Sequence, residues 1–453
     1  MPKQIHLAAH FPGVNNTTVW TDPRSGSNVD FRSFVHLAQT AERGKFDFFF
    51  LAEGLRLREQ RGKIFDLDVV GRPDTFTVLA ALAAVTEKLG LAGTINATFN
   101  EPYELARQFA TLDHLSAGRA GWNVVTSSDA FTGENFRRGG FLDHSQRYER
   151  AAEMVQAARE LWDSWAADAI VADGQFVRAG GLRPFSHQGK QFDIAGEFSV
   201  PRMPQGHPVI IQAGDSDSGR EFGAATADAI FSRHGTLAEG QAFYQDMKSR
   251  LAKYGRHRDQ LKILPGVTYI LGDTQAQAHE LAADVRRQQV GPQTAIAFAE
   301  QLWNRDLSSY DPEGPLPDVD PEPDAVSISQ GRARTHRDRL ASVQKWRALA
   351  AERNLSLREV VIEITGRQSF IGTPRQVAEE INSFVQNDAS DGFILVPHLT
   401  PGGLDDFVDK VVPELQERGV FRTEYAGSTL REHLGLAPVE EREQSPSSAV
   451  VSV

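Results

Sequence analysis

Short apolar runs alternate along the chain with longer stretches in which apolar residues recur at helical spacing. Apolar runs of this length, bounded by turn residues, are typical of buried strands, and the periodic stretches between them are typical of amphipathic helices. The predicted strands are Ile5–Ala9, Phe46–Ala52, Leu89–Thr94, Ala120–Val125, Pro208–Ala213, Ala229–Ser232, Leu261–Val267 and Gly392–Val396. The predicted helices include Phe31–Arg43, Thr75–Lys88, Tyr103–Leu115, Arg147–Trp162, Gly219–Ala227, Ala238–Tyr254 and Thr373–Asn387. This alternation predicts repeated strand–helix units and a parallel sheet.

The number of predicted strands decides between two parallel-sheet architectures. Eight strands with interleaved helices are typical of a (β/α)8 TIM barrel, and we predict this α/β fold. An open doubly wound sheet usually has a G-x-G-x-x-G turn after its first strand, and the sequence contains no such turn. Residues 1–436 are expected to form a single barrel domain, since such a barrel can take up 250 residues or more. Residues 437–453 have no periodicity and are expected to be disordered.

Four predicted connections are too long to be simple turns: roughly Gly54–Asp74, Thr126–Asp143, Ala166–Gln205 and Gly272–Phe370. Loops of this length usually carry function or have structure of their own. In a barrel the first two lie at the C-terminal mouth, where such enzymes place their chemistry. The insertion at about 272–370 is expected to act as a lid over the mouth. It is predicted to contain helices within Thr274–Asp306 and Ser327–Arg353, separated by an acidic, proline-rich segment, Asp311–Asp324, that is expected to be mobile or extended.

Composition narrows the classes of function. The chain has 453 residues and a formal net charge of −12, which disfavours nucleic acid or an anionic membrane as its main partner. The absence of cysteine excludes disulfides, thiolate metal sites and a cysteine nucleophile. No run approaches 18 apolar residues, and the N-terminal segment is too short and polar for a secretion signal, so a cytoplasmic location is expected. The 13 histidines show no metal-ligand spacing, and metal catalysis is therefore disfavoured.

Polar side chains occur at strand positions where a barrel interior should be apolar. In LGLAGTINATFN, Thr94, Asn96 and Thr98 alternate and should share one face of the predicted strand. Inward polar groups need partners, so these residues either bond to one another and to water or bind a ligand. Asn123 shares a face with Val125 in the next predicted strand, and its amide can donate and accept. Taken alone, Asn123 is better explained as a structural residue.

Two segments have residues suited to an anion site at a helix N-terminus. His144 and Tyr148 are four residues apart at the start of a predicted helix, so both can donate to a phosphate from one face. The turn QAGDSDSG follows the fifth predicted strand and offers free N–H groups and hydroxyls, including that of Ser216. Ser218 and Glu221 predict a capping box that begins the next helix. For the first segment, the alternative is a capping histidine and a half-buried tyrosine. For the second, it is an ordinary capped helix start.

Three further features lie at or near predicted strand ends. Glu53 and His10 each directly follow a strand, at the barrel end where catalytic residues lie, but each could equally be a structural residue in an ion pair or a cap. The loop Leu55–Lys63 is basic. It could bind a carboxylate substrate, although a solvated surface is the commoner explanation of such a run.

Together these segments resemble the bacterial-luciferase-like flavin-dependent monooxygenases, in the branch of nitrilotriacetate monooxygenase component A, dibenzothiophene-sulfone monooxygenase and pristinamycin synthase. The resemblance extends from Ile5 to about Leu436 and is carried, in order, by FNEPYELARQFATLDHLSAGRAGWNVVTS, DHSQRYERA, PVIIQAGDSDSGREF and VVPELQERGVFRTEYAGSTLREHLGL. It implies a barrel that binds FMN at its mouth. The positions that match flavin contacts are Glu53, Thr94 or Thr98, Asn123, His144, Tyr148 and Ser216, of which Tyr148 and Ser216 fall where the phosphate is held.

The resemblance also implies a reaction and partners. Family members use reduced FMN and O₂, by way of a C4a-peroxyflavin, to oxygenate a small organic substrate. They receive reduced FMN from a separate NAD(P)H-dependent flavin reductase and form homodimers or homotetramers. The flavin carries the difficult chemistry, while the protein places it and excludes water, and His10 is our candidate for proton handling or peroxide orientation. Two alternatives remain: a deazaflavin-dependent dehydrogenase on the same barrel, and a flavin-binding protein without turnover.

Overall fold

A closed barrel of eight parallel strands forms the centre of the computed structural model, which describes residues 2–11, 17–67, 70–127, 130–136, 146–171, 177–322, 327–331, 338–366 and 369–440. The strands, in barrel order, are β1 (His6–His10), β15 (Gly392–Leu395), β11 (Lys262–Val267), β10 (Ala229–Ser232), β9 (Val209–Gln212), β6 (Ala120–Val125), β5 (Gly90–Asn96) and β2 (Phe48–Leu51). Every predicted strand matches one of these to within two residues at each end. The predicted (β/α)8 fold is therefore confirmed.

Apolar side chains fill the lower and middle parts of the barrel interior. The inward residues include Ala8, Phe48, Phe50, Ala92, Val209, Ile211, Leu264 and Ile394. At the N-terminal end, the short helix α14 (Leu430–His433) and the residues after it add Leu430, Leu434 and Leu436 to the same core. The alternate, outward strand residues pack beneath the helices in a larger core. This packing leaves the C-terminal mouth as the end of the barrel that can receive a ligand.

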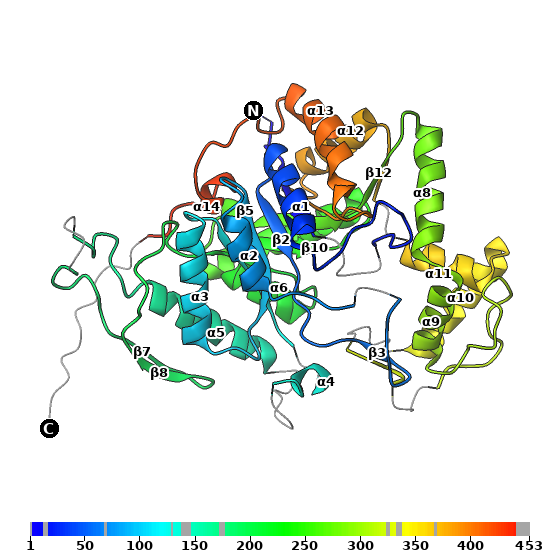
Figure 1. Cartoon of the computed structure of the whole chain (residues 1–453), viewed down its shortest axis with the longest axis horizontal. Coiled ribbons are helices and arrows are strands. Elements are labelled where there is room, and N and C mark those ends of the chain that lie inside the picture. The colour runs from blue at the N-terminus through cyan, green and yellow to red at the C-terminus, as the bar shows by residue number, and fades with distance from the viewer. Residues whose placement is uncertain are drawn as a thin grey trace.

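The helices surround the strands as repeated strand–helix units require (Figure 1). They are α1 (Phe31–Arg43), α2 (Thr75–Ala83), α3 (Pro102–Leu115), α5 (Arg147–Trp162), α6 (Asp217–Thr226), α7 (Leu237–Arg250), α12 (Pro374–Gln386) and α13 (Val412–Glu417). Shorter helical segments are η1 (Leu251–Tyr254), η2 (Arg258–Gln260), η3 (Gly402–Leu404) and the π-helical η4 (Phe407–Val411). No helix in the described part of the chain is long and apolar enough to cross a membrane.

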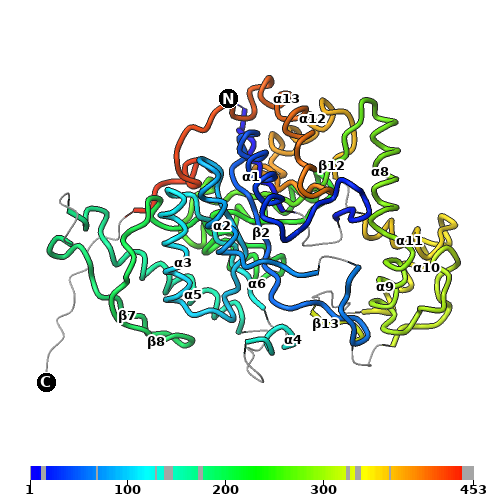
Figure 2. The backbone as a smooth tube through the Cα atoms, in the orientation of Figure 1, coloured from blue at the N-terminus to red at the C-terminus, as the bar shows by residue number. Residues whose placement is uncertain are grey.

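The first three long connections contain short elements. They are β3 (Glu59–Gln60) and β4 (Lys63–Ile64) in the first, α4 (Ala130–Gly133) in the second, and the antiparallel pair β7 (Phe185–Gln188) and β8 (Asp193–Gly196) in the third. The fourth contains α8 (Gln275–Gln289), α9 (Pro292–Trp303), β13 (Ser329–Gln330), α10 (Arg339–Arg353) and α11 (Leu357–Thr365). At its two ends, β12 (Tyr269–Leu271) and β14 (Phe370–Gly372) form a parallel pair. Figure 2 shows α8 leading away from the barrel to α9, α10 and α11.

The insertion has its own hydrophobic core and is joined to the first long connection. Residues such as Phe298, Trp303 and Val343 form a cluster separate from the barrel cores. Strand β13 pairs with β3, and the buried Gln60 side chain donates to the Glu300 carboxylate over 2.7 Å. The two connections are therefore one joined unit.

Two segments expected to lack fixed structure are partly described. The proline-rich segment lies against α9 and α10: Trp303 Nε1 donates to the Val319 carbonyl over 2.8 Å, and Arg347 donates to the Pro317 carbonyl over 3.0 Å. The side chains of two helices thus hold the described part of this segment, which also contains a turn in which the Gly314 N–H donates to the Asp311 carbonyl over 3.0 Å. At the C-terminus, Arg202 donates to the Val439 carbonyl over 3.3 Å. Residues 441–453 lie outside the described part of the chain.

Candidate active site

Two neighbouring strands bring a pair of polar side chains into the barrel mouth. The register of β5 and β6 pairs Thr94 with Asn123. The Asn123 Nδ2 donates to the Thr94 hydroxyl over 2.8 Å, and both residues are buried. The Asn123 Oδ1 is buried as well and has no hydrogen-bond partner among the described residues. Since a buried acceptor without a donor is costly, this atom indicates a ligand that donates a hydrogen bond here.

Glu53 lies just past the end of β2, in the same part of the mouth. Burial, with a smaller contribution from the Asp74 carboxylate, raises the pKa of its carboxyl to about 8, against the opposing effect of a hydrogen bond from the Asn96 backbone. Such a carboxyl is protonated at pH 7 and can donate a hydrogen bond. Glu53 and Thr94 line one cavity of about 460 Å³ with Asn96, Val125, Ser127 and residues of the long connections.

His10 ends β1 and lies at the base of the mouth. Its ring packs between the rings of Phe50 and Phe231, at centroid distances of 5.3 and 6.2 Å. Burial and the positive charge of Arg72 lower the imidazole pKa to about 3, although a backbone hydrogen bond at Phe11 acts in the opposite direction. The ring is therefore neutral at pH 7. Its Nδ1 is buried and has no partner in the described part of the chain.

Two other predicted contacts are not brought into this group. Strand β5 ends at Asn96, whose Oδ1 accepts the Thr98 backbone N–H over 2.6 Å. The predicted alternation therefore stops at Asn96, because its side chain caps the turn that follows. Thr98 lies in that turn, and its hydroxyl accepts the Ser127 N–H over 3.1 Å. His144 lies outside the described residues.

A second polar group surrounds the N-terminus of α6. Ser216 is the N-cap residue, and its hydroxyl accepts the Gly219 N–H over 3.2 Å. The predicted capping box of Ser218 and Glu221 is wrong, because Ser218 lies inside the helix. An N-cap requires extended backbone, and Ser216 has it, with φ −69° and ψ 159°. The helix therefore begins at Asp217, two residues earlier than predicted.

Tyr148, in the first turn of α5, reaches the turn before α6. A Cβ on either Gly214 or Gly219 would come within 2.9 Å of the Tyr148 hydroxyl oxygen. Glycine at both positions therefore permits this close approach. The tyrosine hydroxyl, the Ser216 hydroxyl and the N-terminal N–H groups of α6 lie together, which is a suitable set for a phosphate.

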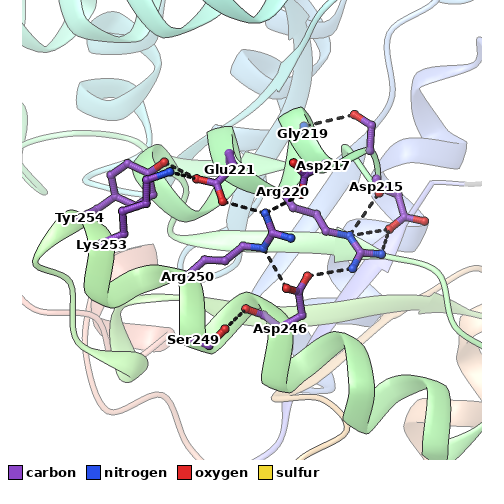
Figure 3. A network of polar contacts seen from close by, with 11 residues as sticks. Asp215, Asp217, Gly219, Arg220, Glu221, Asp246, Ser249, Arg250, Lys253 and Tyr254 are labelled. Atoms are coloured by element: carbon purple, nitrogen blue, oxygen red, sulfur yellow. Dashed lines mark hydrogen bonds and ion pairs between the residues drawn. The ribbon is translucent and has the colours of Figure 1, made fainter.

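An ion-pair network that the sequence analysis missed fixes this turn (Figure 3). Arg220 donates to the Asp215 carboxylate over 2.7 Å and to Asp246 over 2.8 Å. Arg250 pairs with Asp217 and with Asp246, each at 2.9 Å. Asp246 on α7 thus bridges the two arginines. The sequence offers one signal, the four-residue spacing of Asp246 and Arg250 on a helix, and this spacing gives no link to α6.

The basic loop Leu55–Lys63 contacts other connections. Arg56 pairs with Glu134 at 2.7 Å and lies over the Phe131 ring. Arg61 pairs with Glu300 of the insertion at 3.2 Å. Arg56 and Arg61 are therefore engaged in joining segments around the mouth.

The fold and the site define a class of barrel enzymes. One part of the mouth presents neutral, buried hydrogen-bonding groups, and another presents a turn suited to phosphate. This combination fits a phosphorylated cofactor with a large polar ring, held at the C-terminal end of the strands where barrel enzymes work.

Comparison with known proteins gives the family. The sequence-family model of the luciferase-like monooxygenases matches residues 13–390 of this chain. The chain is 41% identical to nitrilotriacetate monooxygenase component A from Aminobacter aminovorans, over 92% of this chain and 93% of that protein. It is 40% identical to N-acetyl-S-(2-succino)cysteine monooxygenase from Bacillus subtilis (strain 168), over 96% and 97%. The structure of riboflavin lyase with a modified FMN and its substrate riboflavin superimposes with a TM-score of 0.79 at 29% identity, covering 96% of this chain and 97% of that one.

The chain belongs to the luciferase-like monooxygenase family, and it is a flavin-dependent monooxygenase. The family predicted from the sequence is thereby confirmed. The roles of the individual site residues remain predictions.

Proposed function

We propose that the chain is the oxygenating component of a two-component system that uses reduced FMN and O₂ to insert one oxygen atom into a small organic substrate. Two relatives support the existence of a partner protein, because each is named as one part of a larger enzyme: nitrilotriacetate monooxygenase component A, and the first of the two subunits named for pristinamycin IIA synthase. An NAD(P)H-dependent flavin reductase is the partner that this reaction needs, because the chain must receive its flavin already reduced.

One observation carries the choice of FMN: the same mouth offers places for a ring and for a phosphate. The edge of a flavin ring carries N–H and C=O groups, which complement the unpartnered Asn123 Oδ1 and the protonated Glu53. The turn at Ser216, with Tyr148 above it, would hold the phosphate. The bound flavin supplies the reaction with O₂ at its C4a position. The protein residues orient it and keep water away.

His10 and the insertion fit the task of keeping water away from the flavin. The neutral His10 ring, shielded by Phe50 and Phe231, can hold or pass one proton at an edge from which these rings exclude water. The insertion, joined to the loop after β2 by the β3–β13 pair, is placed to close over the mouth as a lid.

The test uses the purified chain with chemically reduced FMN. The flavin is titrated without oxygen, and air-saturated buffer is then added with or without each of a panel of substrates: nitrilotriacetate, N-acetyl-S-(2-succino)cysteine, dibenzothiophene sulfone, a long-chain alkane and dimethyl sulfide. We expect oxygenated product with at least one compound, and less hydrogen peroxide than in the reaction without substrate. A deazaflavin-dependent dehydrogenase would not bind reduced FMN in the titration and would form no oxygenated product. A flavin-binding protein without turnover would bind it, but its reduced FMN would only pass electrons to O₂ and release hydrogen peroxide.

The same assay tests His10. A His10→Ala variant should bind reduced FMN with near wild-type affinity but yield at least about tenfold less product, with a matching rise in peroxide, because it lacks the proton-handling group. A variant that retains full coupling of oxygen uptake to product would remove His10 from the mechanism without affecting the proposed reaction.

A further inference from the structure

The turn proposed to hold the FMN phosphate contains an acidic residue on each side of Ser216. Asp215 precedes it and Asp217 follows it, and both side chains are largely exposed. At a separation of about 7 Å in water, each pair of like unit charges disfavours binding by a factor of about two to three. A phosphate dianion beside two free aspartates would therefore be bound poorly, although the backbone geometry suits it.

Each aspartate is paired with a guanidinium, and both guanidiniums also pair with other carboxylates: Arg220 with Asp246, and Arg250 with Asp246 and, at 2.7 Å, with Glu221. Arg220 holds the Asp215 carboxylate at 2.7 Å through Nη2, and its Nε donates to the Asp215 backbone carbonyl over 3.2 Å. Arg250 holds Asp217 at 2.9 Å. Hydrogen bonds to Asp246 and Asp217 keep the pKa of Arg250 above its ordinary value, so its charge is permanent. The negative charges of the turn are thus paired next to the site.

One carboxylate fixes both arginines. Asp246 on α7 accepts Arg220 on Oδ2 at 2.8 Å and Arg250 on Oδ1 at 2.9 Å (Figure 3). Although burial opposes ionisation, hydrogen bonds from Arg220 and Arg250 lower the pKa of Asp246. The charged form of Asp246 therefore persists, and it anchors the two guanidiniums to a helix outside the turn.

We propose that Arg220 and Arg250 are positioning residues that offset the charges of Asp215 and Asp217 in part and so allow an acidic turn to accept the phosphate of FMN. This inference rests on the proposed FMN site. It assigns the network a role in ligand selection, the preference for FMN over riboflavin, in addition to the stability that any ion pair provides.

The experiment compares reduced FMN with reduced riboflavin in anaerobic titrations. In Arg220→Gln and in Arg250→Gln, the Kd for FMN should rise about three- to tenfold, while the Kd for riboflavin stays within twofold of wild type. The double variants Asp215→Asn/Arg220→Gln and Asp217→Asn/Arg250→Gln should recover wild-type FMN affinity, because the uncompensated charge is gone. Asp215→Asn alone should bind FMN at least as well as wild type. It tests the charge argument in a chain that keeps both arginines.

A matched control lies on the other side of the network. Lys253 pairs with Glu221 at 2.7 Å, one helical turn beyond Asp217 on α6. Glu221 keeps its second partner, Arg250 at 2.7 Å, when Lys253 is replaced, so Lys253→Gln should leave both flavin affinities unchanged. Equal weakening of FMN and riboflavin, or no recovery in either double variant, would overturn the proposal and leave the arginines a purely structural role. Equal affinity of the wild-type chain for FMN and riboflavin would instead refute the phosphate site of the proposed function.

Discussion

The part of the mouth proposed to bind the flavin ring (the ring side) and the part proposed to bind the phosphate (the phosphate side) offer polar groups to one ligand in opposite ways. On the ring side, Thr94 and Asn123 are 6% and 3% exposed, and neither side chain carries a charge. On the phosphate side, the side chains of Asp215 and Asp217 are 71% and 84% exposed and carry charges that are paired. Both sides are polar, but the polar side chains of the ring side are buried and those of the phosphate side are exposed.

The difference follows from the free energy of removing charge from water. Burial raises the pKa of Glu53 to about 8 and lowers that of His10 to about 3, so opposite shifts leave both groups neutral near pH 7. Exposed ions remain hydrated, so a charge on the phosphate side costs little free energy, and the ion pairs there can be changed at low cost in stability. Binding on the ring side should therefore depend on single hydrogen bonds and protonation states, and binding on the phosphate side on net charge.

The largest expected effect concerns the neutral state of Glu53. Its pKa is raised from an ordinary 4.5 to about 8, so the folded chain keeps a proton that the unfolded chain releases between these values. This contribution makes the free energy of unfolding fall as pH rises from about 4.5 to about 8, by up to about 1.4 kcal/mol per pH unit, with no further change outside that window. Glu53→Gln cannot ionise and should remove this slope.

Urea unfolding of both proteins at pH 5.5, 6.5, 7.5 and 8.5 measures the difference. We expect wild type to lose about 3 kcal/mol relative to Glu53→Gln across this series. Glu352→Gln, at an exposed position on α10, is the control and should follow wild type. Parallel pH profiles for wild type and Glu53→Gln would mean that Glu53 is ionised and that the comparison between the two sides is wrong.

A smaller effect is expected from the asparagine of the ring side. Asn123→Ala removes both the donor to Thr94 and the unpartnered acceptor. Because the acceptor is expected to bind the ring and not the phosphate, the Kd values of reduced FMN and reduced riboflavin should rise together, by about tenfold, as for the loss of one or two buried hydrogen bonds. Anaerobic titration measures both. A loss confined to FMN would place Asn123 on the phosphate side.

Much of the fold could be predicted because its signals are local. Each barrel strand is an apolar run, and the helices between them follow from their own periodicity. Glu53 and His10 could be placed at the mouth because both follow a predicted strand, and this prediction requires no knowledge of tertiary contacts. The choice of Ser216 over Ser218 as the N-cap required backbone geometry, since the segment DSDS offers two serines of equal propensity.

The remaining features depend on contacts between distant segments. The network around Asp246 joins α6 to α7, and the Gln60–Glu300 bond joins a barrel loop to the insertion across 240 residues of sequence. The shift of the Glu53 pKa likewise depends on burial by segments far apart in the chain. Pattern and propensity carry no information on such pairs, so the sequence could name candidate residues but not their protonation states or their support.

The smallest effect in this series should come from the tyrosine that completes the phosphate side. Tyr148→Phe removes one hydroxyl near Gly214 and Gly219 but keeps the ring that packs on Phe222 at a centroid distance of 5.9 Å. Because Tyr148 is only partly buried, water can take the place of its hydroxyl, and the Kd for reduced FMN should rise about three- to tenfold. The Kd for reduced riboflavin should stay unchanged, since it has no phosphate. An equal loss for both flavins would show that Tyr148 acts on the ring and that the mouth does not divide as we infer.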